Sequence, residues 1–232
     1  MPYRRTETVA RRLAARRAAI IAAARMAAGE GGMAAVQIAT VARRAGIAAG
    51  TVYRYFPGKT DLVAALINEI SDREIAALRR AADVAPGPLS ALSAAIMTFS
   101  ARARRDRRLS FAALAEPVDA ELDDARLSFR RALAAELSRR IAVAIAGQHL
   151  PEQDAALAAS ALVGLLVEGL IGPLAPAAAG RERDLVQSLA LTALRALGVA
   201  DARARGLVVQ TALPSDVVAV NAPPGADGET SR

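Results

Sequence analysis

Apolar residues recur every three or four positions along most of the chain, the spacing that places them on one side of an α-helix. The pattern is clear from residue 60 to residue 83, where Leu62, Leu66, Ile70 and Leu78 would form the buried side of one long helix. No segment alternates apolar and polar residues over a useful length, and no internal repeat is present. The sequence therefore predicts an all-α protein.

Other helices are predicted on both sides of this one. An amphipathic helix is expected over 12–29, ended by Glu30-Gly31-Gly32. Pro86-Gly87-Pro88 is the clearest boundary, because two prolines flanking a glycine cannot continue a helix. Beyond it the expected helices cover 89–103, 108–115, 120–146, 152–171 and 184–197.

Both ends of the chain lack this periodicity. Residues 1–11 favour a disordered tail, and the alternative is a basic arm that carries Arg4, Arg5 and Arg11 along a nucleic-acid backbone. From about residue 200 the chain turns to Pro, Gly, Asp and isolated valines, a composition typical of disorder. We therefore expect a mostly disordered tail over 200–232.

Two short helical patterns flank a glycine between residues 37 and 56. In the first, Ile38, Val41, Ala42 and Ala45 fall on one side. Gly46 should end that helix, because glycine reaches the left-handed conformation of a C-terminal cap without a Cβ clash.

In the second pattern Val52 and Phe56 should pack inward, and Pro57-Gly58 should end the run. The residues expected to face largely outward are Thr51, Tyr53, Arg54 and Tyr55. Two short helices joined by a glycine-bearing turn predict a helix-turn-helix, the motif that lays its second helix in the major groove of DNA.

Several residues of this window stand in a recognisable register. They are Val41-Ala42-x-x-Ala45-Gly46-Ile47, Gly50-Thr51-Val52-Tyr53-x-Tyr55-Phe56, Lys59 and Leu62. Together they closely resemble the DNA-binding domain of TetR-family transcriptional regulators. The resemblance implies a three-helix DNA-binding domain over 12–69 with its motif at 37–56, followed by a helical ligand-binding and dimerisation domain over 87–199.

The resemblance also assigns DNA contacts. The implied contact residues are Gln37, Ala39, Thr40, Ala49, Gly50, Thr51, Tyr53, Arg54, Tyr55 and Lys59. Arg54 is the expected reader of a guanine through two hydrogen bonds, and Thr51 could touch a thymine methyl group. Lys59 and the two tyrosines would hold phosphates. Family members usually carry Thr at the position of Gln37, whose longer side chain should cap the following helix poorly.

The distribution of charge agrees with a polyanion-binding N-terminal end. The chain has a net charge of +7, and residues 1–60 hold ten Arg and one Lys against Glu7 and Glu30, a local charge of +9. The remainder therefore carries −2. All of the basic excess lies with the predicted motif, as expected of a DNA-binding segment.

Composition narrows the remaining chemistry. Cysteine is absent, which excludes disulfides and thiolate chemistry and suits a reducing cytosol. The apolar, uncharged run 155–167 is too short to span a membrane, so we expect a cytoplasmic protein. The single histidine, His149, favours an exposed cation at a helix end, and we expect no catalytic residue, metal or cofactor.

The last two predicted helices, 152–171 and 184–197, are apolar on more sides than one chain can cover. Leu157, Ala161 and Leu165 recur there with the small residue Gly164, which permits close backbone approach. The resemblance implies that this pair meets its two-fold mate as a four-helix bundle in a homodimer. The alternative is an ordinary buried core.

These observations predict a ligand-responsive regulator, a repressor that binds a palindromic DNA operator as a dimer and is released by a small molecule. The effector pocket is expected among the helices of 89–171, lined by Phe99, Phe111 and Phe129, although each could be plain core. Glu168 lies within an apolar helix and resembles a buried functional carboxylate, held by a ligand or by a partner such as Arg102.

A different function class stays open at this point. The chain could be a helical enzyme or metal-binding protein that uses buried carboxylates such as Glu168, with the helix-turn-helix only a packing element. The acidic run Glu116, Asp119, Glu121, Asp123 and Asp124 could bind a hard cation, although acids at a helix start are common.

Overall fold

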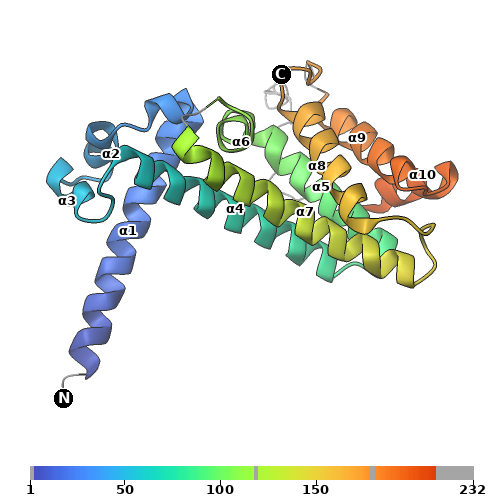
Figure 1. Cartoon of the computed structure of the whole chain (residues 1–232), viewed down its shortest axis with the longest axis horizontal. Helices are drawn as coiled ribbons and strands as arrows, with labels where there is room; N and C mark the ends of the chain where they lie inside the picture. Colours follow the sequence, from blue (N-terminus) through green and yellow to red (C-terminus); the bar gives the residue numbers. More distant parts are fainter. Residues whose placement is uncertain (1–2, 118–119, 178–180, 213–232) are drawn as a thin grey trace, which may run out of the picture.

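The computed structural model describes residues 3–117, 120–177 and 181–212, with side chains described from Glu7 onward. All regular structure in these residues is helical, with ten α-helices and two short 3₁₀ turns (Figure 1). The all-α prediction is therefore confirmed. The N-terminal elements are α1 (Tyr3–Gly31), η1 (Met33–Ala35), α2 (Ile38–Arg44) and α3 (Ala49–Tyr53). They are followed by α4 (Lys59–Asp83), α5 (Pro88–Arg105), α6 (Arg107–Leu114), η2 (Ala120–Leu122), α7 (Asp123–Ala146), α8 (Ala155–Leu170), α9 (Glu182–Ala196) and α10 (Asp201–Gln210).

Helix α4 packs against the N-terminal helices at its start and against the body helices along its length. It contacts α1 on one side and α5 and α7 on the other, and it runs beside α7 along the molecule (Figure 1). Leu62, Leu66, Ile70 and Leu78 are at most 4% exposed, so the predicted apolar side is the buried one. Pro88 begins α5 directly after Gly87, in agreement with the predicted break.

One leucine of α7 lies outside the buried side of the helix. Phe129, Leu133, Leu137 and Ile141 are buried, but Leu127 is 42% exposed. Two residues along an α-helix correspond to a rotation of about 200°. Leu127 therefore cannot share a face with Phe129, and it points to solvent.

The expectation of disorder before residue 12 was wrong for residues 3–11, which form the first turns of α1. Alanine, arginine and glutamate favour helix, and Arg11 bonds Glu7 at 2.8 Å one turn away. The first half of this helix extends away from the body (Figure 1), and residues 7–19 are all exposed. Residues 1 and 2 lie outside the described residues.

The expectation of a disordered tail from residue 200 was also wrong for its first part. Residues 201–210 form α10, which packs on α9 and α5 through Ala204 and Val208, two apolar residues one turn apart. Just past the helix, the Thr211 hydroxyl lies 2.8 Å from the buried hydroxyl of Ser93. These tertiary contacts override a weak local pattern, while residues 213–232 lie outside the described part of the chain.

A buried carboxylate joins α4 to α7. Glu136 is 2% exposed and accepts hydrogen bonds from Arg79, Arg139 and Arg140 at 2.6–2.8 Å. Arg140 also donates to Asp83 at the end of α4, at 2.7 Å. Burial alone would raise the pKa of the Glu136 carboxyl, but the three arginines outweigh it and hold the pKa below the ordinary value. The buried charge is thus compensated on three sides.

Removing this charge should destabilise the protein strongly. Glu136→Gln leaves Arg140, itself 7% exposed, with only one of its two carboxylate partners, Asp83, which should cost about 1–3 kcal/mol of unfolding free energy. Chemical denaturation at neutral pH measures the loss, with the exposed Glu152→Gln as the control. A loss equal to that of the control would contradict the role given to Glu136.

The lowered pKa also fixes the sign of the pH dependence. The stability that ionised Glu136 supplies is fully present above its ordinary pKa of 4.5 and is lost as the pH falls through the lower folded-state value. The difference in unfolding free energy between wild type and Glu136→Gln should therefore shrink in strong acid.

Candidate nucleic-acid interface

The turn between α2 and α3 has the geometry that the sequence predicts. Gly46 has a φ of +65°, in the left-handed region that glycine adopts without strain. The Gly46 N–H donates to the Arg43 carbonyl at 3.2 Å, and the Ile47 N–H donates to the Ala42 carbonyl at 3.0 Å. These bonds satisfy carbonyls at the end of α2 and turn the chain toward α3.

Four buried residues hold the motif together: Val41, Ala42, Val52 and Phe56, each at most 3% exposed. Helix α1 packs against α2, which in turn packs against α3, and the Arg17 guanidinium of α1 lies 5.2 Å from the centre of the Phe56 ring. Arg44, at the end of α2, donates two hydrogen bonds to Glu30 at the end of α1 and thereby lowers the pKa of that carboxyl. The two helices of the motif are therefore fixed against α1.

The residues expected to contact DNA are left free on the outside of this scaffold. Seven are exposed, namely Gln37, Ala39, Ala49, Gly50, Tyr53, Arg54 and Lys59, and three are half-buried, namely Thr40, Thr51 and Tyr55. A Cβ atom at Gly50 would meet no other atom within 4 Å. Nothing inside the described part of the protein requires glycine at this position.

The flanks of the recognition helix differ in detail from the expectation. Arg54 is the C-terminal cap of α3, one residue beyond the helix. Lys59 is the first residue of α4, where the Gly58 N–H donates to Asp61 at 2.9 Å. Gln37 makes no capping bond and instead donates its side-chain amide to the Ala34 carbonyl at 2.9 Å, in agreement with the expectation of a poor cap.

A junction between the motif and the body was not predicted. Glu116, just after α6, accepts a hydrogen bond from the Met33 N–H at 3.0 Å. Gly32, with a φ of +71°, lets the carboxylate approach closely, because a Cβ there would lie 2.8 Å from a carboxylate oxygen. At the other end of α6, Arg108 donates to the Glu30 carbonyl at 2.6 Å. Helix α6 is therefore bonded at both ends to the turn that leads into the motif.

The acidic run takes part in this junction. Besides Glu116, Glu121 accepts a bond from the Thr60 hydroxyl at 3.3 Å. Within the described residues, which omit Asp119, no group of three or more His, Asp or Glu is placed to hold a metal ion. This junction was not predicted from the sequence. Its only local signs are the two glycines at 31 and 32, at the end of α1, and Glu116-Pro117, which follows α6.

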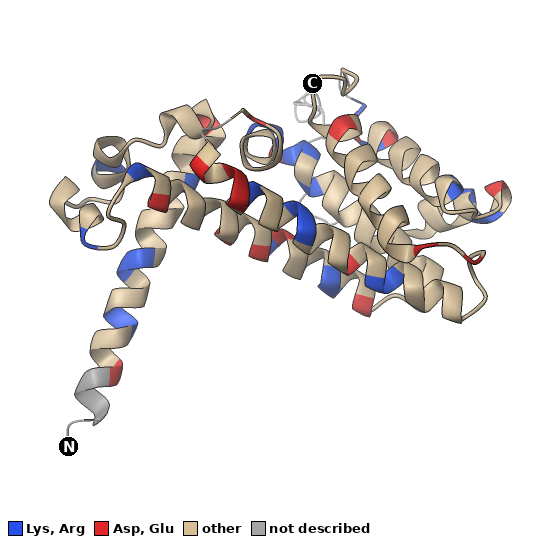
Figure 2. Ribbon diagram, viewed as in Figure 1, with Lys and Arg blue, Asp and Glu red and all other residues tan. Residues whose placement is uncertain are grey.

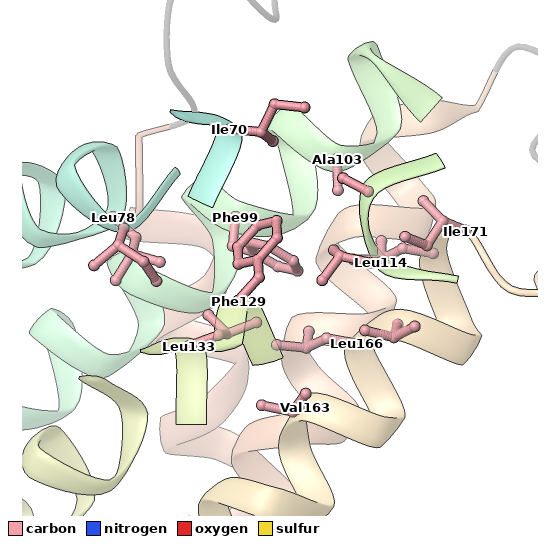
Figure 3. Packing of buried hydrophobic residues seen from close by; sticks show 14 of the residues in the cluster. Ile70, Leu78, Phe99, Ala103, Leu114, Phe129, Leu133, Val163, Leu166 and Ile171 are labelled. Atoms are coloured by element: carbon pink, nitrogen blue, oxygen red, sulfur yellow. The ribbon is translucent and has the colours of Figure 1, made fainter. Parts of the chain in front are cut away.

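The three phenylalanines predicted to line a ligand pocket lie in or beside the core of the body. Phe99 and Phe129 are at most 2% exposed and pack among leucines and isoleucines in the body core (Figure 3), while Phe111 is half-buried. The reading of Glu168 as a buried carboxylate was wrong, because its residue is exposed. Its suggested partner Arg102 donates two hydrogen bonds to Glu74 instead.

Helical spacing explains the exposure of Glu168. It lies on one stripe of α8 with Leu157, Ala161 and Gly164, three or four residues apart, and all four are exposed. His149 is exposed in the turn after α7, as predicted. Among the described residues, no helix combines the length and the apolar character needed to cross a membrane.

The fold and the exposed motif define a helical DNA-binding regulator. Residues 20–66 match the model of the bacterial regulatory proteins of the tetR family. The N-terminal segment of the chain therefore carries a DNA-binding domain of the tetR family type. No curated protein sequence matches it.

Solved structures share the fold of the whole molecule. RolR in complex with resorcinol superposes with a TM-score of 0.67 at 23% identity, over 89% of this chain and 98% of that one. FadR from Bacillus subtilis in complex with stearoyl-CoA gives 0.64 at 22%, over 78% and 97%. SmeT, the repressor of a Stenotrophomonas maltophilia multidrug efflux pump, gives 0.59 at 21%, over 78% and 89%.

The different positions of Arg54 and Lys59 predict different effects on DNA binding. Arg54→Ala should cost about 1–3 kcal/mol and relax the preference at one base position. Lys59→Ala should weaken binding to all sequences alike and lower the salt dependence by about one phosphate contact. Affinity titrations of randomised operators at several salt concentrations separate the two, and a loss of base preference in Lys59→Ala alone would reverse the assignment.

Proposed function

We propose that the protein is a repressor that binds a near-palindromic operator as a homodimer and leaves it when a small organic molecule binds the body. The observation that carries the proposal is the exposed face of α2 and α3, held on a buried scaffold within the segment of charge +9. Arg54 and the small residues Ala49 and Gly50 would face the major groove. Tyr53, Tyr55 and Lys59 would fix the register on phosphates.

Dimerisation is supported by the outer surface of α8 and α9. Leu157 is 69% exposed, and Ala161 and Gly164 continue its stripe without bulky side chains. On α9, Leu185 and Leu189 are half-buried, and Leu189 packs so closely on α8 that a Cβ at Gly169 would lie 2.7 Å from it. The two helices would pair with those of a second copy in a four-helix bundle.

A dimer would also compensate for the small number of base contacts that one short recognition helix can make. Helix α3 has five residues, so a single copy offers few base contacts. Two copies related by a two-fold axis would enter successive major grooves about 34–36 Å apart. The operator should then consist of two inverted half-sites about one turn apart.

The response to a ligand is supported by the shared fold and by the junction. Similar structures hold resorcinol in RolR and stearoyl-CoA in FadR. In this chain Phe99 and Phe129 fill the space between α5 and α7, so an effector entering there would have to displace core side chains. Such a displacement would reach the DNA-binding domain through α4 and through the bonds of Arg108 and Glu116.

A charged substitution on the proposed dimer surface tests whether operator binding needs both recognition helices of a dimer. Leu157→Arg adds a cation at a site that is exposed in one chain, so the chain should fold but dissociate, because pairing would bury an unpaired charge. Val84→Arg, at an apolar residue elsewhere that is 84% exposed, is the control. Sedimentation and operator titration should show a monomer with weak operator binding for Leu157→Arg only. A monomer that binds the operator with wild-type affinity would refute the mechanism.

Cutting the junction tests the path between body and motif. Glu116→Ala leaves the Met33 N–H without its acceptor and should loosen the turn around Gly32 by about 1–3 kcal/mol. Amide hydrogen exchange over residues 31–36 should quicken, while Glu152→Ala leaves it unchanged. Exchange that stays slow in Glu116→Ala would show that the carboxylate does not hold the turn.

A further inference from the structure

A cleft of about 900 Å³ separates the DNA-binding domain from the body. One wall is α1, the second is α4 at Glu69 and Arg73, and the third is the turn from α5 to α6 over residues 105–109. Its apolar lining comes from α1 and from the start of α6, and includes Ala18, Ile21, Ala22, Met26 and Leu109. Its volume lies within the range of pockets that hold small molecules.

The charged lining of the cleft is strongly basic. It contains Arg17, Arg25, Arg73, Arg105, Arg107 and Arg108 against two acids, Glu69 and Asp106. The cleft lining therefore carries a net charge of about +4 in a concave site, where low-dielectric walls concentrate the positive potential.

Only part of this charge is compensated by the protein. Arg73 pairs with Glu69 at 3.1 Å, and Arg105 pairs with Asp106 at 2.9 Å. Within the described part of the chain, Arg25 and Arg107 pair with no carboxylate. They reach the cleft from two different helices, Arg25 from α1 and Arg107 from α6.

We propose that this cleft binds a small organic anion with an apolar body, such as an aryl or acyl carboxylate. The carboxylate would accept charge-assisted hydrogen bonds from Arg25 and Arg107. The apolar body would cover Ala18, Ala22 and Met26, of which the last is 60% exposed. A neutral compound would leave the arginines unpaired, and a bare inorganic anion would leave the apolar lining in water.

The position of the cleft means that a bound anion would also link the DNA-binding domain to the body. Because Arg25 belongs to the DNA-binding domain and Arg107 to the body, one anion between them would tie the two parts together. This is a different place from the core around Phe99 and Phe129, where an effector would act under the proposed function. The anion would therefore stabilise one orientation of α1 relative to α6, whatever a core ligand does.

Calorimetric titration of the full-length protein without DNA tests the proposal, with octanoate as the anionic probe and 1-octanol as its neutral counterpart. Octanoate should bind at one site per chain, about tenfold or more tightly than octanol, since charge-assisted hydrogen bonds distinguish the two. Arg25→Gln and Arg107→Gln should each weaken octanoate about tenfold. Arg203→Gln, at an exposed arginine of α10, should not.

A variant that keeps every charge gives an independent test. Ala22→Phe, at an exposed position of the lining, should fill the cleft and weaken octanoate while the arginines remain. Circular dichroism melts identify any variant that fails to fold, and these four changes replace exposed or half-buried side chains. Equal affinity for octanoate and octanol, or octanoate binding unaffected by Ala22→Phe and both cleft arginine variants, would overturn the proposal.

A second outcome would also overturn it. If the arginine variants weaken operator binding without any probe and lower its salt dependence, while octanoate binding is absent, the cleft is a contact surface for the DNA backbone. Because the probe titration contains no DNA, it can succeed or fail independently of the proposed repressor function.

Discussion

Helix α4 spans one continuous hydrophobic core that reaches from the N-terminal helices into the body, and the rest of the structure depends on that burial. Its first turns bury Leu62, Val63 and Leu66, and α4 packs on α1; its later turns bury Ile75 and Leu78, and α4 also packs on α5 and α7. Such a helix cannot bend or shift at one end of the core without disturbing the other end, because protein interiors are close-packed. The recognition helix therefore has a defined position relative to the body.

Ion pairs between α4 and α7 fix the register in which these two helices pack. Arginine is the only cation of the body, since Lys59 is the single lysine of the chain. Its planar guanidinium can bond two acceptors at once, as Arg140 does with Glu136 and Asp83. A slide of α7 along α4 by one turn would break the two bonds that cross between these helices, from Arg79 to Glu136 and from Arg140 to Asp83. The network therefore disfavours alternative packings of two otherwise smooth, alanine-rich helices.

Local patterns predicted much of the fold because each helix carries its own apolar periodicity and its own stop signal. The motif was predictable for the same reason, since Gly46, Val52 and Phe56 lie within one short window. The bond from Met33 to Glu116 was not, because 83 residues separate its partners and neither is unusual locally. The burial of Glu168 was predicted wrongly, because the sequence of a helix that is apolar on most sides does not show which side faces solvent. Helix α10 is short, and only its contacts with α9 and α5 explain it.

The long first helix also has a mechanical consequence. Its buried part begins at Ile20, and the 17 residues before that extend about 25 Å from the docked end at 1.5 Å per residue. A tilt of about 10° at the docked end would therefore move the tip by about 4 Å, roughly the rise of one base pair along DNA. Small rearrangements around Ile20 and Ala24 would be magnified along the exposed part of α1, which carries bands of arginine (Figure 2). The exposed first half of α1 would therefore move as a rigid arm about the buried part of the helix, which packs in the core of the DNA-binding domain.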